Sequence, residues 1–191
     1  MARDIPIIFS GPMVRALLDN RKDRTRRLAS SPLAKVQPAD RLWVRECWSD
    51  QDCREGEAMY RATACRDGLL PEEKAETRWR PSIHMPRWAN RITLIVTETR
   101  FQPLQAITPV EMLREGAYRL PGRTIDRFAA SLAAGGVEPG VVDTIRDAWI
   151  KLWNSLHDKP GQRWEDNPDV VELTFHVVPS NIDAAPAAVA A

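Results

Sequence analysis

The sequence contains few residues of the kinds that stabilise small secreted proteins or anchor proteins in membranes. Three of its 191 residues are cysteine, and an odd number in a chain of this length does not favour a disulfide framework. No apolar run approaches the roughly 18 residues of a bilayer-spanning helix, and the first residues lack the apolar core of a signal peptide. We therefore expect a cytoplasmic protein with reduced thiols and no membrane partner.

Several short motifs that carry catalysis or cofactor binding are also missing. The chain has no glycine-rich phosphate loop and no Gly-x-Ser-x-Gly elbow. Cys47, Cys53, Cys65 and His84 are enough ligands for a zinc ion, but their spacing forms no compact Cys-x-x-Cys pair. We predict neither a metal nor a cofactor.

Charge is balanced over the whole chain but not along it. The totals are 27 basic and 26 acidic residues, and 43% of the residues are hydrophobic, which is enough for a proper core. Residues 1–100 hold 19 of the basic and 14 of the acidic side chains. A polyanion such as RNA could therefore dock on one face without the whole protein being basic.

The densest positive charge lies at 21–27, where five basic residues and Asp23 surround Thr25. Such a cluster attracts phosphate, and a hydroxyl among cations is a candidate for chemistry. The apolar residues before it recur at helical spacing, and Asn20 can take the left-handed conformation that ends a helix. We expect the cluster to lie on a connection that begins where this helix stops.

The remaining pattern predicts alternating strands and helices. Strands are expected at 5–9, 42–48, 58–62, 92–101 and 170–178, and helices at 12–20, 108–115 and 141–157. Thr108 caps the second helix, with Pro109 at its first position and Glu111 three residues after the cap. Apolar residues of the third helix form a stripe that we expect to face the core, at Ile145, Trp149, Leu152, Trp153 and Leu156.

These elements indicate an α+β fold, a small mixed β-barrel with helices at its edges. We predict a single domain over 1–180, with a proline-rich extended insertion at 66–90 and a helical segment around 120–157. Residues 181–191, which are rich in alanine, are expected to form a disordered tail.

Three segments resemble the ASCH domain: a short helix followed by Lys22-x-x-Thr25-x-Arg27, the run at 40–46, and the run at 107–116 that ends in Glu115-Gly116. The segments at 78–88 and 152–155 make the chain similar to the longer ASCH proteins of bacteriophages and prophages. The resemblance extends over most of 5–178. It implies a barrel like that of the PUA RNA-binding domains and, if the chain is phage-encoded, a place in the bacterial host cell.

Some small bacterial ASCH proteins are amidohydrolases that remove the acetyl group from N(4)-acetylcytidine with a lysine, a threonine and a glutamate. The resemblance assigns these roles to Lys22, Thr25 and Glu115. In such a reaction the Thr25 hydroxyl would attack and Arg27 or a backbone N–H would bind the oxyanion. Either Lys22 or Glu115 could be the base. Lys22 needs a lowered pKa for this, and we expect Asp23 beside it to keep the amine protonated.

Two functions therefore stay open. In the first, the chain is a binding module for RNA or a modified nucleoside in a basic barrel pocket, with arginines as nucleic-acid contacts: Arg21, Arg24, Arg26, Arg27, Arg45 and Arg80. In the second, the same pocket belongs to a hydrolase, either the amidohydrolase or a ribonuclease, an activity also reported within the ASCH group. The tryptophans and arginines at 78–88 could stack bases, or the rings could pack beneath the insertion. The sequence does not indicate an oligomeric state.

Overall fold

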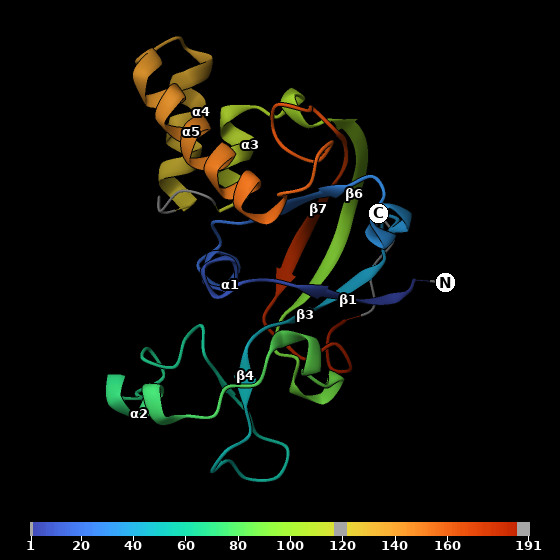
Figure 1. The fold of residues 1–191 in the computed structure, drawn as a ribbon, viewed down its shortest axis with the longest axis vertical. Coiled ribbons are helices and arrows are strands. Elements are labelled where there is room, and N and C mark those ends of the chain that lie inside the picture. The colour runs from blue at the N-terminus through green and yellow to red at the C-terminus, as the bar shows by residue number, and fades with distance from the viewer. Residues whose placement is uncertain (1, 117–121, 187–191) are drawn as a thin grey trace. The chain divides into compact units, whose positions relative to one another are not determined.

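The α+β class is confirmed by the structure, a computed structural model that describes residues 2–116 and 122–186 (Figure 1). The strands are Asp4–Ile8 (β1), Arg24–Leu28 (β2), Arg41–Arg45 (β3), Trp48–Ser49 (β4), Met59–Tyr60 (β5), Thr93–Pro103 (β6) and Asp169–Val178 (β7). The α-helices are Gly11–Leu18 (α1), Pro71–Glu76 (α2), Pro109–Arg114 (α3), Gly122–Ala133 (α4) and Pro139–Leu156 (α5).

Five of the strands form one sheet, in the order β1-β3-β6-β7-β2. Strand β1 runs parallel to β3, β3 is antiparallel to β6, and β2 is antiparallel to β7. The short strands β4 and β5 form a separate antiparallel pair. Over the described residues the sheet is not closed into a barrel, so the PUA-like barrel stays a prediction.

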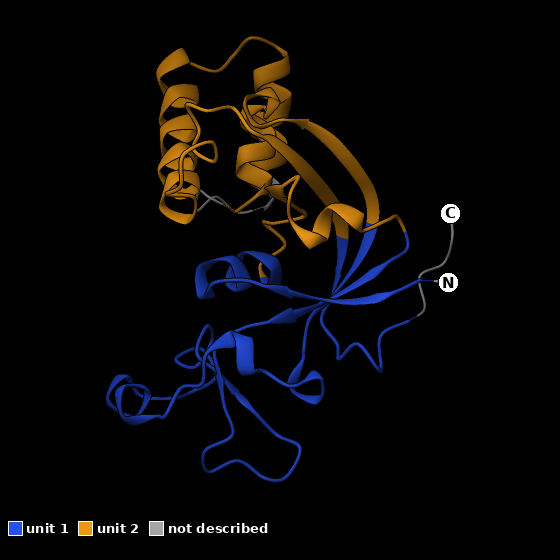
Figure 2. Ribbon diagram, turned by 45° about the vertical axis from the view of Figure 1, so that its right-hand side comes forward, with its two compact units in different colours: residues 1–18, 39–96, 176–191 blue, residues 19–38, 97–175 orange. Residues whose placement is uncertain are grey.

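The chain divides into two compact units, which Figure 2 colours blue and orange. Unit 1 comprises residues 1–18, 39–96 and 176–191, and unit 2 comprises residues 19–38 and 97–175. Strands β6 and β7 each contribute residues to both units. The prediction of one domain over 1–180 is not tested by this division.

The core of unit 1 follows the predicted periodicities. On β3, Leu42 and Val44 are buried and alternate with half-buried residues, as expected for a strand with one face in the core. Helix α1 buries Val14, Ala16 and Leu17. Asn20 follows it with a φ of 52°, so the predicted left-handed helix end is confirmed.

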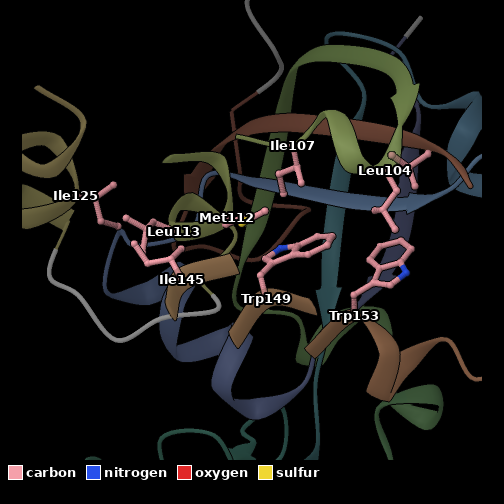
Figure 3. Packing of buried hydrophobic residues seen from close by; sticks show 9 residues of the cluster. Leu104, Ile107, Met112, Leu113, Ile125, Ile145, Trp149 and Trp153 are labelled. Atoms are coloured by element: carbon pink, nitrogen blue, oxygen red, sulfur yellow. The ribbon is translucent and has the colours of Figure 1, made fainter. Parts of the chain in front are cut away.

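The core of unit 2 gathers apolar residues of α3, α4, α5 and β7 (Figure 3). The rings of Trp149 and Trp153 on α5 are stacked with centroids 5.4 Å apart. Together with Ile145 they confirm the predicted stripe. Leu156 is 68% exposed, so its predicted place in the core was wrong; it is the last residue of α5.

The predicted extended insertion at 66–90 was wrong in part, because it contains helical turns. Helix α2 begins at Pro71, and the Glu73 side chain accepts a hydrogen bond from the Leu70 N–H. Short 3-10 turns occupy Ser82–His84 and Arg87–Ala89, each directly after a proline. Pro71 occupies the first position of α2, which its fixed φ suits, whereas Pro81 and Pro86 stand directly before the 3-10 turns.

The prediction of a disordered tail from residue 181 was also wrong for residues 181–186, and 187–191 lie outside the described residues. The side-chain amide of Asn181 donates hydrogen bonds to three backbone carbonyls, those of Arg87, Trp88 and Asn90. Ile182, which follows it, is fully buried. One asparagine thus anchors a segment whose alanine-rich composition indicates no order.

Among the described residues, no helix combines the length and apolar character needed to cross a membrane.

Candidate functional site

The basic segment forms a strand, which corrects the predicted connection. Residues 24–28 are β2, which pairs with β7 so that Thr25 lies opposite Leu173 and Arg26 opposite Glu172. Side chains alternate along a strand, so Thr25 and Arg27 share one face and Arg24 and Arg26 the other. The carboxylate of Glu172 is what allows an arginine into this buried strand position.

Helix α3 brings two glutamates to the same region of unit 2. The predicted cap is confirmed: the Thr108 hydroxyl accepts from the Glu111 N–H, and the Glu111 carboxylate accepts from the Thr108 N–H. Glu111 and Glu115 are four residues apart and therefore share a helix face. Gly116, with a φ of 80°, ends the helix where the sequence predicts.

Arg26 lies at the centre of a buried cluster of carboxylates. Its guanidinium donates to Glu115 at 2.7 Å, to Glu172 at 2.8 Å and to Glu111 at 3.0 Å. The Arg26 side chain has no exposed surface. Its Nε has no hydrogen-bond partner among the described residues. This burial leaves no room for the direct nucleic-acid contact that the sequence assigns to Arg26.

Two further arginines complete the cluster from its outer side. Arg24 contacts Glu172 at 3.1 Å, and Arg100 contacts Glu111 at 2.7 Å and Glu172 at 2.6 Å. Burial raises the pKa of Glu111. The Thr108 N–H and the cations Arg26 and Arg100 together lower this pKa by more, so the net shift is downwards. Much of the positive charge at 21–27 is thus offset by carboxylates from α3 and β7.

Lys22 is buried beside the end of α3. It forms an isolated β-bridge with Glu115, and its Nζ donates to the Glu115 carbonyl at 2.9 Å and the Arg24 carbonyl at 2.7 Å. Burial lowers the pKa of Lys22 to about 8, against the opposing effect of the Glu115 charge. The shift has the direction that a base requires, while the two hydrogen bonds to carbonyls use the amine as a donor.

Asp23 does not have the effect expected from its position next to Lys22. Its carboxylate accepts from Arg24 at 2.9 Å and from Arg114 at 2.8 Å. Asp23 does raise the pKa of Lys22, but burial lowers that pKa more. Neighbours in sequence point to opposite faces of an extended chain, which explains why Asp23 does not dominate.

Thr25 is held by Arg27 on the opposite face of β2 from Arg26. The Arg27 Nη1 donates to the Thr25 Oγ1 at 2.8 Å and to the Arg26 carbonyl at 2.9 Å. Burial lowers the pKa of Arg27, and the charge of Glu115 opposes this. Lys22 therefore contacts the Glu115 carbonyl directly, whereas the side-chain contact of Thr25 is with Arg27.

The other predicted nucleic-acid contacts have partners outside the carboxylates of this cluster. Arg21 pairs with Asp19 in unit 2. In unit 1, Arg45 donates to the Ile83 carbonyl and its guanidinium lies 5.3 Å from the Trp43 ring centroid. Arg80, half-exposed, pairs with Asp50 and lies over the Trp48 ring. Their role as nucleic-acid contacts stays a prediction.

Sequence reasoning missed Glu172, Glu111 and Arg100 as members of the cluster. Glu172 did carry a signal, because it is a lone carboxylate within an apolar strand run. Glu111 had been assigned only to the helix cap. Nothing in the local sequence of Arg100 distinguishes it from a solvated arginine.

No metal centre joins these residues: within 2–116 and 122–186, no group of three or more histidine, cysteine, aspartate and glutamate residues is arranged to hold a metal ion. Cys47, Cys53 and Cys65 are free thiols. Comparison of the chain with protein-family models, curated proteins and solved structures found no match. The resemblance to the ASCH domain therefore stays a prediction.

Proposed function

We propose that the protein is an ASCH-type, PUA-like protein that binds a nucleobase or nucleoside, free or within RNA, beside Lys22, Thr25 and Glu115. The observation that carries the proposal is the buried hydrogen bond that the Lys22 amine donates to the backbone carbonyl of Glu115, at the end of α3. Polar groups that are already ordered lose little conformational freedom on binding a small polar ligand. The three ASCH-like segments support the class of ligand.

A nucleoside fits this cluster better than an extended polyanion does. Arg24, Arg26 and Arg100 are paired with Glu111 and Glu172, so their attraction for phosphate is reduced. The polar groups that remain for recognition belong to Lys22, Thr25 and Arg27. Lys22 and Thr25 are 2% and 1% exposed, so a ligand reaches them only when the surrounding chain opens locally. Such groups match the edge of a base more closely than a phosphate chain.

The test is titration of the protein with cytidine, N(4)-acetylcytidine and a short single-stranded RNA, measured by calorimetry. Lys22→Met should weaken binding about tenfold or more, because it removes a hydrogen bond from a charged donor. Lys35→Met, an exposed lysine of the same unit, is the matched control and should bind as the wild type does. Equal affinity in all three proteins would rule out Lys22 as part of the site.

A hydrolase is the second candidate, and the lowered pKa of Lys22 is the observation that favours it. The Thr25 oxygen would attack the acetyl carbonyl while its proton passes to neutral Lys22, and Arg27 would stabilise the oxyanion. The proton that Lys22 takes would then pass to the departing cytidine nitrogen, either directly or through the Glu115 carboxylate. Water would then release acetate from Thr25. Glu115 could instead act as the first base.

This candidate is tested by incubating the protein with N(4)-acetylcytidine and following cytidine and acetate release against pH. With Lys22 as the base, the rate should rise as pH approaches 8 and then level off. Thr25→Val should abolish release, whereas Thr25→Ser, which keeps a hydroxyl, should retain part of it. A flat pH profile, or full activity of Thr25→Val, would contradict the mechanism. Cleavage of single-stranded RNA in a parallel arm would favour the ribonuclease instead.

A further inference from the structure

Unit 1 contains a cavity of about 380 Å³ that no predicted site residue lines. Its walls come from β5 and the residue before it, from the turns that follow β5, and from Arg91, two residues before β6. The lining residues are Ala58, Met59, Tyr60, Ala64, Asp67, Leu69 and Arg91. This volume lies within the range of small-molecule sites, roughly 300–1,000 Å³. The walls are about equally polar and apolar, and they include one carboxylate and one guanidinium. Such a mixture is typical of sites that bind planar, partly polar ligands.

The guanidinium in this cavity is fixed on several sides. Arg91 donates through Nε and Nη2 to both carboxylate oxygens of Glu46, at 2.9 and 3.1 Å, and through Nη1 to the Thr63 hydroxyl at 3.0 Å. It also lies over the ring of Tyr60, 3.8 Å from the centroid. Together these contacts fix the orientation of the guanidinium plane. The Tyr60 ring covers one face of the plane, and a heterocycle would stack on the other.

The charges around the cavity select against anions. Glu46 is 1% exposed and pairs with Arg91 bidentately, so the arginine has little net attraction for phosphate or carboxylate. Asp67 adds a further negative charge. Its Oδ2 accepts from the Thr63 hydroxyl, and its Oδ1 accepts no hydrogen bond from the described residues. An acceptor is therefore available for a ligand that carries N–H donors.

We infer that this cavity binds a planar heterocycle with an exocyclic amino group, such as cytosine or adenine, which stacks on Arg91 and donates to Asp67. All of its residues belong to unit 1. The inference therefore does not depend on the function proposed for Lys22, Thr25 and Glu115.

The test compares ligands that differ in the amino group: cytidine with uridine, and adenosine with inosine, each titrated by calorimetry and followed by backbone amide NMR. The wild type should bind the amino-bearing member of each pair about tenfold tighter, with shifts at residues 58–69 and 91. Asp67→Asn should reduce this preference, because a neutral amide oxygen is a weaker acceptor than a carboxylate, and it should leave the fold intact, because Asp67 is exposed. Asp52→Asn, an exposed aspartate of the same unit at a φ that asparagine tolerates, is the matched control and should retain the preference.

Equal binding within each pair, or shifts confined to residues 22–27 and 111–115, would overturn the inference. The second result would leave the proposed function standing, so the two failures are distinguishable. A cytidine tetranucleotide replaces cytidine in a further arm. Tighter binding of the tetranucleotide with the same loss in Asp67→Asn identifies a base within a strand as the ligand, and equal binding identifies the free nucleoside; either result supports the site.

Discussion

Arg26 in unit 2 and Arg91 in unit 1 each form an ion pair with a buried glutamate, yet the surroundings of the two arginines differ. Arg26 contacts three glutamates, and other arginines and a backbone N–H also bind these carboxylates. Glu46 has Arg91 as its cationic partner, and burial raises the pKa of Glu46 more than Arg91 lowers it. The pKa of Glu111 moves down instead. Glu46 is buried more deeply than Glu111 and has fewer donors around it, and both differences favour the higher pKa of Glu46.

The largest expected effect comes from removing the cation at the centre of the richer cluster. Arg26→Met leaves Glu115 buried without its arginine and should lower the free energy of unfolding by about 3–5 kcal/mol. Arg91→Met should lower the free energy of unfolding by less, about 2 kcal/mol. It leaves a single carboxylate, Glu46, without its cation, and the raised pKa of Glu46 makes it easier to protonate. Urea unfolding at pH 7 measures both values.

Arg80→Ala is the control for these two variants, since Arg80 is half-exposed. Its cost should stay within about 1 kcal/mol. A smaller loss in Arg26→Met than in Arg91→Met would invert the comparison between the two clusters.

Lys22 gives the next largest effect, and it appears as a pH dependence. Its pKa is about 8 in the folded protein and 10.5 ordinarily, so the unfolded chain binds more protons between these values. The cost of burying the charged amine is complete below pH 8 and is relieved as the pH rises towards 10.5. Relative to Lys22→Met, the wild type should therefore gain up to about 3 kcal/mol over this window.

Chemical denaturation at pH steps from 7 to 10.5 measures this gain. Lys35→Met, which removes an exposed lysine, should follow the wild type throughout. A constant difference between the wild type and Lys22→Met over the window would show that the amine is not shifted.

Glutamine variants of Glu46 and Glu111 test the opposite pKa directions. Glu111, with its lowered pKa, contributes stability above its unfolded pKa that is lost as the pH falls, so the deficit of Glu111→Gln should shrink on acidification. Glu46, with its raised pKa, contributes stability that is present at low pH and lost as the pH rises. The free energy of unfolding of the wild type, relative to that of Glu46→Gln, should therefore increase in acid.

Urea unfolding at pH steps from 7 to 4 measures both slopes. The sign of the slope decides the outcome. Slopes of the same sign for Glu46→Gln and Glu111→Gln would remove the contrast between the two clusters.

The smallest expected effect concerns the cap that holds Glu111 in place. Thr108→Ala removes the hydroxyl that accepts from the Glu111 N–H and should lower the free energy of unfolding by about 1 kcal/mol. Thr108→Ser should restore most of this loss. A full loss in Thr108→Ser would show that the threonine methyl group, and not the cap, is responsible.

Much of the fold was predictable because its signals are local. The end of α1 at Asn20, the capping box of α3 and the apolar stripe of α5 each depend on residues within a few positions of one another. The errors have the opposite character. Residues 181–186 are ordered by carbonyls of residues 87–90, and no pattern within the tail indicates this contact.

For the candidate site, the sequence determined which side chains are present and that Glu115 closes a short capped helix. The tertiary structure decided that Arg26 is buried among carboxylates, that Lys22 contacts Glu115, and that Asp23 binds Arg24 and Arg114. The physical reason is that burial and ion pairing depend on groups distant in sequence, such as Glu172, which lies 146 positions from Arg26. Composition fixes the charges, but only packing decides which of them meet solvent.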